Sequence, residues 1–224
     1  MNKALSSLTL LLALAGVSTV SQAQGDPAKG EAKAAMCIGC HGIIGYQATF
    51  PEVHKVPMIS GQTDKYIAAS LVAYQKGDRK HPTMRGIAAS LTEQDIADLA
   101  AYYSQHGKAP AAPAALAKEV PANLKDRMAA CVACHGANFS SPIDPSYPRV
   151  AGQHADFLAA ALRAYQTDGN PHVGRNNAMM RGQLVQEADG KKKYNFTPAE
   201  IRQMAQYLSS LPGQLRVVPQ SGRR

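Results

Sequence analysis

The sequence contains no tryptophan, and aromatic residues make up only 6% of its 224 residues. If the chain forms units of fewer than about 100 residues, so few large side chains leave each unit with a thin apolar core. Small units of this kind fold when a bound group supplies the missing apolar surface. The composition therefore favours a chain that depends on a bound group for part of its stability.

Beyond residue 20 the sequence has no apolar run long enough to cross a bilayer. The apolar run at 4–20 follows a basic start, Met1-Asn2-Lys3, and precedes Ser21-Gln22-Ala23, which matches a small-x-small cleavage site. This order is typical of a secretory signal peptide. A membrane anchor is the alternative, but the run is too short and polar residues follow it too soon. We therefore expect cleavage after Ala23 and export of the mature chain to the periplasm.

Only four cysteines are present, and two pentapeptides of the pattern Cys-x-x-Cys-His contain all of them. This pattern is typical of covalent c-type haem attachment, in which two thioethers hold the porphyrin and the adjacent histidine binds iron. A redox dithiol, a structural zinc site and a disulfide are the alternatives for a single Cys-x-x-Cys. Two copies, each followed directly by histidine, favour two covalently bound haem c groups. The predicted haem residues are Cys37, Cys40 and His41 in the first copy and Cys131, Cys134 and His135 in the second.

The rest of the chain repeats in step with these motifs, which indicates a duplicated unit. Residues 57–62 align with 148–153, and Met84-Arg85-Gly86 aligns with Met180-Arg181-Gly182. A stretch rich in alanine and proline lies between the copies and predicts a semi-extended linker. The expected divisions are a signal peptide at 1–23, an N-terminal domain at 24–106, the linker at 107–121 and a C-terminal domain at 122–224.

Apolar residues at helical spacing predict three helices in each copy. Capping signals mark several of the starts, among them Asp26 before Pro27 and Thr92 with Asp95 three residues later. No segment shows convincing strand alternation, so the predicted fold class is all-α. Helices are expected to start near Asp26, Thr92, Pro121 and Thr197. Two further helices are expected to span residues 63–76 and 154–166.

Each iron needs a second axial ligand if it only carries electrons, whereas an open site would favour catalysis or gas binding. Met58 and Met84 are the candidates in the first copy. The repeat aligns Met58 with Arg149 but aligns Met84 with Met180, so Met84 and Met180 are the predicted ligands. Both are expected in a polar loop before the last helix of their copy. Met179 stays open as an alternative to its neighbour Met180.

The other histidines have no counterpart in the opposite copy. A ligand role is therefore not expected for them, and we predict solvated loop or helix-end positions. They are His54, His81, His106, His154 and His172.

The formal net charge of +8 is unevenly distributed, because residues 24–106 are neutral overall and residues 107–224 carry +7. Nucleic acid is not the expected partner of the basic half, since the chain is exported and lacks interleaved aromatic and basic residues. An acidic docking partner is favoured, with at most peripheral contact to a membrane surface. Charge that serves solubility alone is the alternative.

With these features the chain resembles the dihaem cytochrome c4 family over essentially all of its mature sequence. The marks of the resemblance are the two Cys-x-x-Cys-His motifs and the segments 91–100 and 148–154. The resemblance implies two tandem cytochrome c-like domains with His/Met-ligated haems that face each other near the interface. It also implies single-electron transfer between redox proteins, such as a terminal oxidase or a cytochrome bc complex.

The same resemblance assigns a role to two prolines. It implies that Pro57 presents its carbonyl to His41 and that Pro148 presents its carbonyl to His135. Such a contact would fix the tautomer and orientation of each imidazole. A plain turn at these prolines is the alternative.

A haem enzyme is the main competing class, either a small peroxidase or a thiosulfate-oxidising dehydrogenase, or the electron-accepting subunit of such an enzyme. Those sites usually have an open, His/His-ligated or Cys-ligated iron. This chain has no spare cysteine and offers a methionine in register in both copies. A gas sensor would need attached signalling sequence, which the chain lacks. We therefore expect an electron carrier without catalytic residues.

Overall fold

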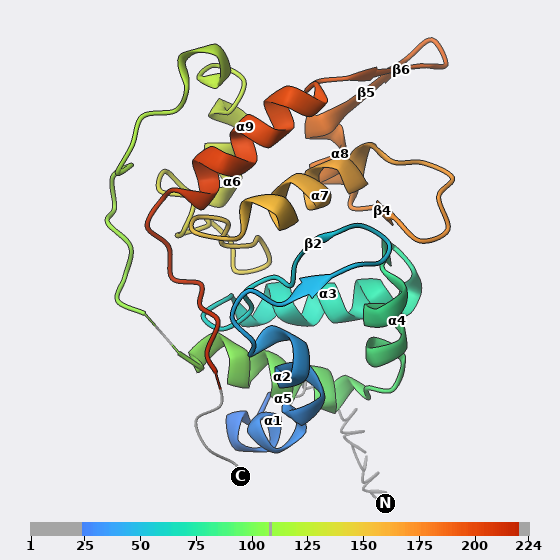
Figure 1. Ribbon diagram of the computed structural model, residues 1–224, viewed down its shortest axis with the longest axis vertical. Helices are drawn as coiled ribbons and strands as arrows, with labels where there is room; N and C mark the ends of the chain where they lie inside the picture. The colour runs from blue at the N-terminus through green and yellow to red at the C-terminus, as the bar shows by residue number, and fades with distance from the viewer. Residues whose placement is uncertain (1–23, 108, 220–224) are drawn as a thin grey trace, which may run out of the picture.

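The computed structural model describes residues 24–107 and 109–219, so the predicted signal peptide and its cleavage site at Ala23 lie outside the described residues. The chain folds into two helical units, with the first copy of the repeat below the second in Figure 1. A segment without helix or strand, 109–121, runs along one side of the molecule and joins them. None of the helices in the described ranges is long and apolar enough to cross a membrane.

The first unit is built from short helices around loops. Helix α1 (Pro27–Lys33) begins where the Asp26 carboxylate accepts hydrogen bonds from the N–H groups of Ala28 and Lys29. The chain turns at the fully buried Ala34, so the single helix expected here divides into α1 and α2 (Ala35–His41). The other elements are β1 (Gln47–Ala48), β2 (His54–Lys55), α3 (Asp64–Lys76), α4 (Pro82–Ala89) and α5 (Glu93–Gln105).

The helices of the second unit follow the same order, with a 3-10 turn, η1 (Ala122–Leu124), in place of α1, whereas its described residues contain no counterpart of β1 and β2. Its last helix starts with a capping box between Thr197 and Glu200. A largely exposed hairpin at residues 185–194 precedes that helix, and it turns at Asp189 and Gly190, which have φ angles of 52° and 69°. The elements are α6 (Ala129–His135), α7 (Ala155–Gln166), α8 (Ala178–Leu184), β5 (Val185–Ala188), β6 (Lys191–Tyr194) and α9 (Pro198–Ser209).

The all-α prediction is confirmed, although the described residues also contain a few short strands. The described residues contain three two-stranded ladders, β1–β2, β5–β6 and a ladder between the units, in which β3 (Arg79–Lys80) pairs with β4 (Gly174–Arg175). Two-residue pairings carry too few side chains to show an alternating pattern. Helices dominate both units, as the all-α prediction requires.

The prediction that the two aligned methionines lie in polar loops is wrong. Met84 lies in α4, which starts at His81 with proline in the first turn. Met180 lies in α8, which starts at Asn177, whose side-chain oxygen accepts the Met180 N–H at 3.0 Å. Polar residues that look like loop sequence are in both cases helix caps.

The two units bury unequal apolar cores. The cluster of the first unit has seven buried residues, whereas that of the second has fifteen and includes Phe139 and Phe196. In the first unit, α5 packs against α1 and α3. The first unit therefore depends more than the second on a group that fills its interior.

The segment after α9 returns to the first unit, as the lower end of the red trace in Figure 1 shows. The Arg216 N–H donates a hydrogen bond to the Ser60 carbonyl at 3.0 Å, and Leu215 is only 1% exposed. This return gives the two units a connection besides the linker. The last two residues, Arg223 and Arg224, lie outside the described residues.

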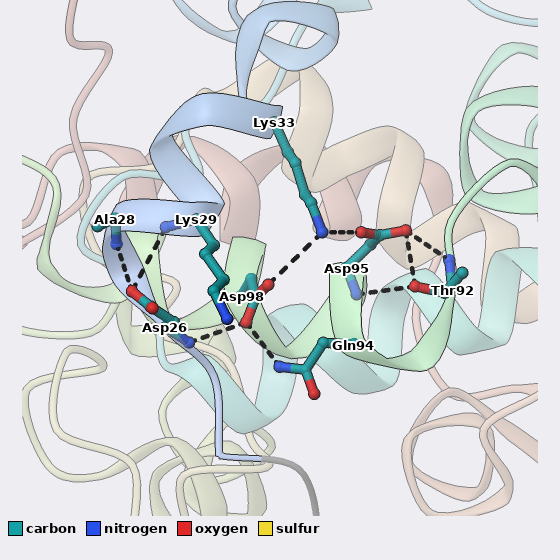
Figure 2. A network of polar contacts seen from close by, with 8 residues as sticks. All are labelled: Asp26, Ala28, Lys29, Lys33, Thr92, Gln94, Asp95 and Asp98. Atoms are coloured by element: carbon teal, nitrogen blue, oxygen red, sulfur yellow. Dashed lines mark hydrogen bonds and ion pairs between the residues drawn. The ribbon is translucent and has the colours of Figure 1, made fainter.

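Asp98 of α5 is the centre of a polar network that fixes α1 (Figure 2). Its side chain is fully buried, and one oxygen accepts the Asp26 N–H at 2.9 Å and the Gln94 amide at 2.7 Å. The Lys33 ammonium lies 3.5 Å from the other oxygen. The helices approach so closely that a Cβ at Gly30 would lie 2.1 Å from the Asp98 carbonyl oxygen. Because α2 follows α1 directly, this network sets where the first Cys-x-x-Cys-His motif lies.

One turn earlier on α5, Thr92 and Asp95 form the predicted capping box. The Thr92 N–H donates to the Asp95 carboxylate at 2.9 Å, and the Asp95 N–H donates to the Thr92 hydroxyl at 3.1 Å. Lys33 also pairs with Asp95, so one lysine of α1 contacts two carboxylates of α5. The start of α5 and the end of α1 are thereby held together (Figure 2).

We expect Asp98→Ala to lower the free energy of unfolding of the first unit by about 1–3 kcal/mol, because the Asp26 N–H loses its buried acceptor. Guanidinium unfolding of the purified protein measures this change. Asp126→Ala, which removes an exposed carboxylate from the second unit, serves as the control and should leave the unfolding midpoint nearly unchanged. Equal effects of the two substitutions would contradict the role given to Asp98.

The effect of Asp98→Ala should also depend on pH. The hydrogen bond from the Asp26 N–H, opposed by burial and helped by Gln94 and Lys33, holds the pKa of Asp98 below its ordinary value. A carboxylate with a lowered native pKa stabilises the fold fully above its unfolded pKa of about 3.9 and loses that effect as pH falls through the native pKa. The stability gap between the wild type and the variant should therefore be full at pH 7 and shrink below about pH 4.

Candidate functional site

A single cavity of about 980 Å³ runs through the interior of both units and across the seam between them. Residues from both copies of the duplicated unit line it. Both copies of the predicted haem residues therefore open onto the same space. The lining includes Cys37, Cys40, His41, Met84, Cys131, Cys134, His135, Met179 and Met180.

The cysteines lie on two short helices that end at the motif histidines. In α2, Cys37 and Cys40 are three residues apart, which places both on one face of the helix, and α6 repeats this with Cys131 and Cys134. All four thiols are free of disulfide bonds. Burial raises the pKa of Cys37 and of Cys131. A redox dithiol needs a lowered thiol pKa, so the environment disfavours that alternative.

The zinc alternative also lacks support. Across residues 24–107 and 109–219, no three histidine, cysteine, aspartate or glutamate side chains are grouped as a metal ion would require. A structural zinc site needs four such ligands in a closed shell. The motif side chains instead face an apolar cavity that is far larger than one ion.

Each motif histidine is held by a backbone carbonyl. The Nδ1 atom of His41 lies 2.8 Å from the Pro57 carbonyl oxygen, and that of His135 lies 2.9 Å from the Pro148 carbonyl oxygen. Burial is the largest influence on both imidazoles and lowers the pKa of each, against the raising effect of the carbonyl bond. Nδ1–H therefore donates to the carbonyl, and Nε2 keeps a free lone pair of the kind that a metal ligand needs.

The candidate methionine ligands differ in how far they are exposed to solvent. Met84 and Met180 are half-buried, whereas Met179 is 54% exposed. The sulfur of Met179 accepts a hydrogen bond from the Tyr147 hydroxyl at 3.4 Å. Met58 also lines the cavity, but it belongs to the segment that contacts the other unit.

The prediction of a solvated position is wrong for one of the histidines that have no counterpart in the other copy. His54 is only 7% exposed, and its ring lies 5.7 Å from that of Phe157 in the second unit, so it is part of the seam and not a solvated residue. The contact joins segments that are far apart in the sequence, which no local pattern reveals. The other four lie at helix ends or in an exposed loop, as expected: His81, His106, His154 and His172.

Two glutamines that the sequence pattern did not single out join the units reciprocally. The Gln62 side chain donates to the Arg149 carbonyl at 3.0 Å and accepts the Arg149 N–H at 2.9 Å. The Gln153 side chain donates to the Met58 carbonyl at 2.9 Å and accepts the Met58 N–H at 3.0 Å. Each glutamine is 4% exposed. We call these four hydrogen bonds the glutamine clamp.

The glutamine clamp connects each unit to the histidine of the other. Met58 directly follows Pro57, and Arg149 directly follows Pro148. Each glutamine thus holds the residue next to the carbonyl that orients the opposite motif histidine. The repeated Gly-Gln pair at the end of both aligned segments was the available signal for this contact.

Further polar contacts line the seam on both sides of the glutamine clamp. Among the described residues they include one ion pair, side-chain bonds to backbone and the β3–β4 ladder. The contacts are Glu52–Arg163 at 2.7 Å, the Lys55 N–H to Asp156 at 3.0 Å, Lys80 to the Asn170 carbonyl at 2.7 Å and Arg149 to the Gly61 carbonyl at 2.8 Å.

The residues around the cavity suit a covalently attached haem in each unit. Each half offers two thiols, a neutral imidazole with one free nitrogen and a methionine thioether, and the walls are mainly apolar. One buried polar atom of the lining, Arg79 Nε, has no hydrogen-bond partner among the described residues. A polar atom without a partner at the edge of an apolar cavity fits a ligand that is apolar with polar edges.

Comparison with known proteins gives consistent results. The family model described as cytochrome c matches residues 27–106 and again 125–212. Cytochrome c4 of Azotobacter vinelandii is 34% identical over 196 residues, which covers 80% of this chain and 89% of that protein. The structure of reduced recombinant cytochrome c4 from Pseudomonas stutzeri matches with a TM-score of 0.60 and 25% identity, over 84% of this chain and all of that chain. A thiosulfate dehydrogenase electron acceptor from Thiomonas intermedia is 27% identical over 80% of each chain.

We expect Gln153→Ala to weaken the contact between the units, because it leaves the N–H and carbonyl of Met58 without partners at the seam. A loss of about 1–3 kcal/mol for each buried group left unpaired predicts an earlier unfolding transition for the first unit. Guanidinium unfolding, in which the transition of each unit is followed separately, measures this shift in the transition. Gln203→Ala removes an exposed amide that pairs with Asn123 within the second unit, and it should have little effect. Wild-type unfolding of the Gln153 variant would contradict the role of the glutamine clamp.

Proposed function

The chain belongs to the cytochrome c family and, within it, to the dihaem cytochrome c4 proteins, and from this premise we propose that it carries single electrons between periplasmic redox proteins through two His/Met-ligated haems. Two cytochrome c domains bind two haem c groups covalently, and the chain is an electron-transfer cytochrome. The observation that carries the proposal is the placement of both motif histidines and both aligned methionines on one cavity. The proposed domains are 24–106 and 122–224, with 107–121 as the linker.

The haem iron supplies one-electron exchange between its ferrous and ferric states. A cysteine pair, Cys37 with Cys40 or Cys131 with Cys134, would hold each haem together with the Nε2 atom of the following histidine. The carbonyls of Pro57 and Pro148 hold each imidazole in one tautomer and one orientation. A ligand that does not rotate between oxidation states keeps the reorganisation small.

Met84 and Met180 are the proposed second axial ligands. They occupy equivalent positions on α4 and α8, and both short helices begin at a side-chain cap that fixes the methionine backbone. Met58 is not proposed, because the glutamine clamp holds its backbone and its counterpart is Arg149. Met180 is preferred to Met179, because Met179 is mostly exposed and engaged by Tyr147. A thioether ligand favours ferrous iron and raises the potential.

The predicted signal peptide and the covalent haem attachment support a periplasmic location. The partners are redox proteins, and a terminal oxidase or a cytochrome bc complex is the proposed kind. The basic C-terminal half suits an acidic docking surface, because three consecutive lysines, Lys191 to Lys193, lie exposed on β6. No nucleic acid partner is proposed.

A second candidate is the electron-accepting subunit of a thiosulfate dehydrogenase. The Thiomonas intermedia relative, whose name states that role, supports it. In both functions this chain takes up and releases electrons and performs no other chemistry. The two functions differ only in the donor, so reduction of the purified protein by a thiosulfate dehydrogenase in the presence of thiosulfate distinguishes them.

The optical spectrum tests the proposed ligands. The oxidised protein should show the weak long-wavelength sulfur–iron charge-transfer band with an amplitude for two haems. Met84→Ala and Met180→Ala should each remove about half of it, because each deletes one of two thioether ligands. Met58→Ala and Met179→Ala are the matched controls and should leave the amplitude unchanged.

Either of two results would overturn this ligand assignment. A full band in the Met84 variant would place the sulfur ligand of the first haem elsewhere. Fast binding of carbon monoxide by the reduced wild type would indicate an open iron and favour the haem-enzyme class instead.

A further inference from the structure

The described chain continues beyond the part that matches the cytochrome c family model. The second match of that model ends at residue 212, whereas the structure describes the chain to residue 219. Residues 213–219 form no helix, and they run from the second unit down to the first, as the lower end of the red trace in Figure 1 shows. We call these residues the strap. The match to the family therefore does not account for the strap or for its path along the first unit.

The start of the strap lies against the glycines that precede the two glutamines of the clamp. A Cβ at Gly213 would lie 2.0 Å from the Ala151 carbonyl oxygen and 3.2 Å from the Gly152 nitrogen. On the other side of the seam, a Cβ at Gly61 would lie 2.5 Å from the Gln214 carbonyl oxygen. Only glycine permits backbones to approach this closely. The strap therefore crosses from one Gly-Gln pair to the other within two residues.

A backbone bridge attaches the middle of the strap to the first unit. Arg216 pairs with Ser60 in an isolated antiparallel bridge, in which its N–H donates to the Ser60 carbonyl at 3.0 Å. Ser60 is buried, and its hydroxyl lies 2.9 Å from Nδ1 of His106 at the end of α5. The His106 ring stacks on the Tyr102 ring, with the ring centres 4.7 Å apart. The first unit thus holds the residue that accepts the strap in a fixed position.

Two apolar residues of the strap are removed from solvent. Leu215 is only 1% exposed, although it belongs to neither of the apolar core clusters of the described residues. The Val218 side chain lies 2.2 Å from the place that a Cβ of Gly107 would occupy, and its carbonyl oxygen lies 3.4 Å from that of Gly42. Gly42 is the residue that ends α2. The strap therefore reaches the helix that carries the first Cys-x-x-Cys-His motif.

The strap is also braced by its own arginine. The Arg216 guanidinium donates to the carbonyls of Gly213 at 2.9 Å and Leu215 at 2.6 Å. These bonds fix the conformation of the strap on both sides of the point where it crosses the seam. A segment that is ordered in its bound conformation loses less entropy when it binds.

The linker is held differently. Its carbonyls at Pro113 and Lys118 accept hydrogen bonds from Asn138 and from the Tyr207 hydroxyl, and both donors belong to the second unit. These bonds fix the linker along the second unit and leave the first unit attached to it by the covalent chain. The strap, in contrast, pairs with the backbone of the first unit.

We propose that the first unit carries a binding surface for an extended apolar peptide, formed by Gly42, Ser60, Gly61 and Gly107, and that the strap occupies it and locks the two units together. The Arg216–Ser60 bridge sets the register, the glycines permit close approach, and the leucine and the valine of the strap supply apolar area. This combination of backbone pairing with apolar side chains is the physical basis of recognition by strand addition. The proposal goes beyond the electron-transfer function and does not depend on the axial ligands.

Cutting the linker of the intact holoprotein tests this lock. A protease recognition sequence inserted between Ala114 and Ala115, which are both exposed, lets the chain be cut after haem attachment. The two fragments should stay together during size-exclusion chromatography. In a variant that ends at Pro212 they should separate, because the strap is missing. A variant that ends at Pro219 is the matched control and should behave like the wild type.

A single substitution gives the size of the effect. Leu215→Ala should raise the dissociation constant of the two fragments at least about tenfold, because it deletes a fully buried apolar side chain. Ile143→Ala, which shortens a side chain of the second unit that is 71% exposed, is the matched control and should leave the constant nearly unchanged.

Gly61→Ala tests the contact between the strap and its surface. The new methyl group would meet the Gln214 carbonyl oxygen, and the φ angle of 81° at Gly61 adds backbone strain. That strain is the same with and without the strap, so a double-mutant cycle with the variant that ends at Pro212 isolates the clash with the strap. The loss of affinity caused by Gly61→Ala should be at least about tenfold larger in the full chain than in the shortened chain.

Three results would overturn the proposal. They are wild-type fragments that separate once the linker is cut, fragments that associate equally well with and without the strap, and an equal effect of Gly61→Ala in both chains. If the variant that ends at Pro212 does not take up haem, Leu215→Ala in the full chain decides, and an unchanged dissociation constant would overturn the lock. The sulfur–iron band, recorded on each variant, shows separately whether the proposed axial ligands are in place.

Discussion

The glutamine clamp is the interaction on which the arrangement of the two haem sites depends. Gln62 and Gln153 are buried, and each makes two hydrogen bonds to the backbone of the opposite unit. The residues that they hold follow the prolines whose carbonyls orient the motif histidines. The orientation of each imidazole is therefore tied to the other unit. This reciprocity explains why both motifs open onto one cavity that crosses the seam.

The scarcity of large side chains in the sequence is reflected in the small apolar core of the first unit. The first unit buries a small apolar cluster, and the cavity takes the place that a larger core would occupy. Haem then contributes apolar surface as well as redox chemistry, and the polar network of Asp98 positions the helix that attaches it. The second unit has the larger core and carries the basic hairpin. The duplicated copies have thus kept the haem residues and diverged in packing and charge.

Local sequence signals are sufficient to predict the helices and to recognise the haem attachment motifs. The caps at Asp26, Thr92 and Thr197 act within four residues of chain, so the sequence states them directly. The short helices around Met84 and Met180 were missed, because cap residues and loop residues have the same composition. The burial of His54 and the glutamine clamp depend on contacts across the seam, roughly 100 residues apart in the chain. The repeated Gly-Gln pair is a sequence signal for the glutamine clamp alone, and a repeat shows equivalence without showing contact.

Two haems in one cavity are expected to exchange an electron within a single molecule. Flash reduction of the fully oxidised protein by less than one electron per molecule tests this, followed at wavelengths where the two haems differ. We predict that the electron redistributes between the haems in a first-order step, with a rate constant that does not change with protein concentration. A rate that rises in proportion to protein concentration would mean that electrons pass between molecules, and it would contradict the shared cavity as the route.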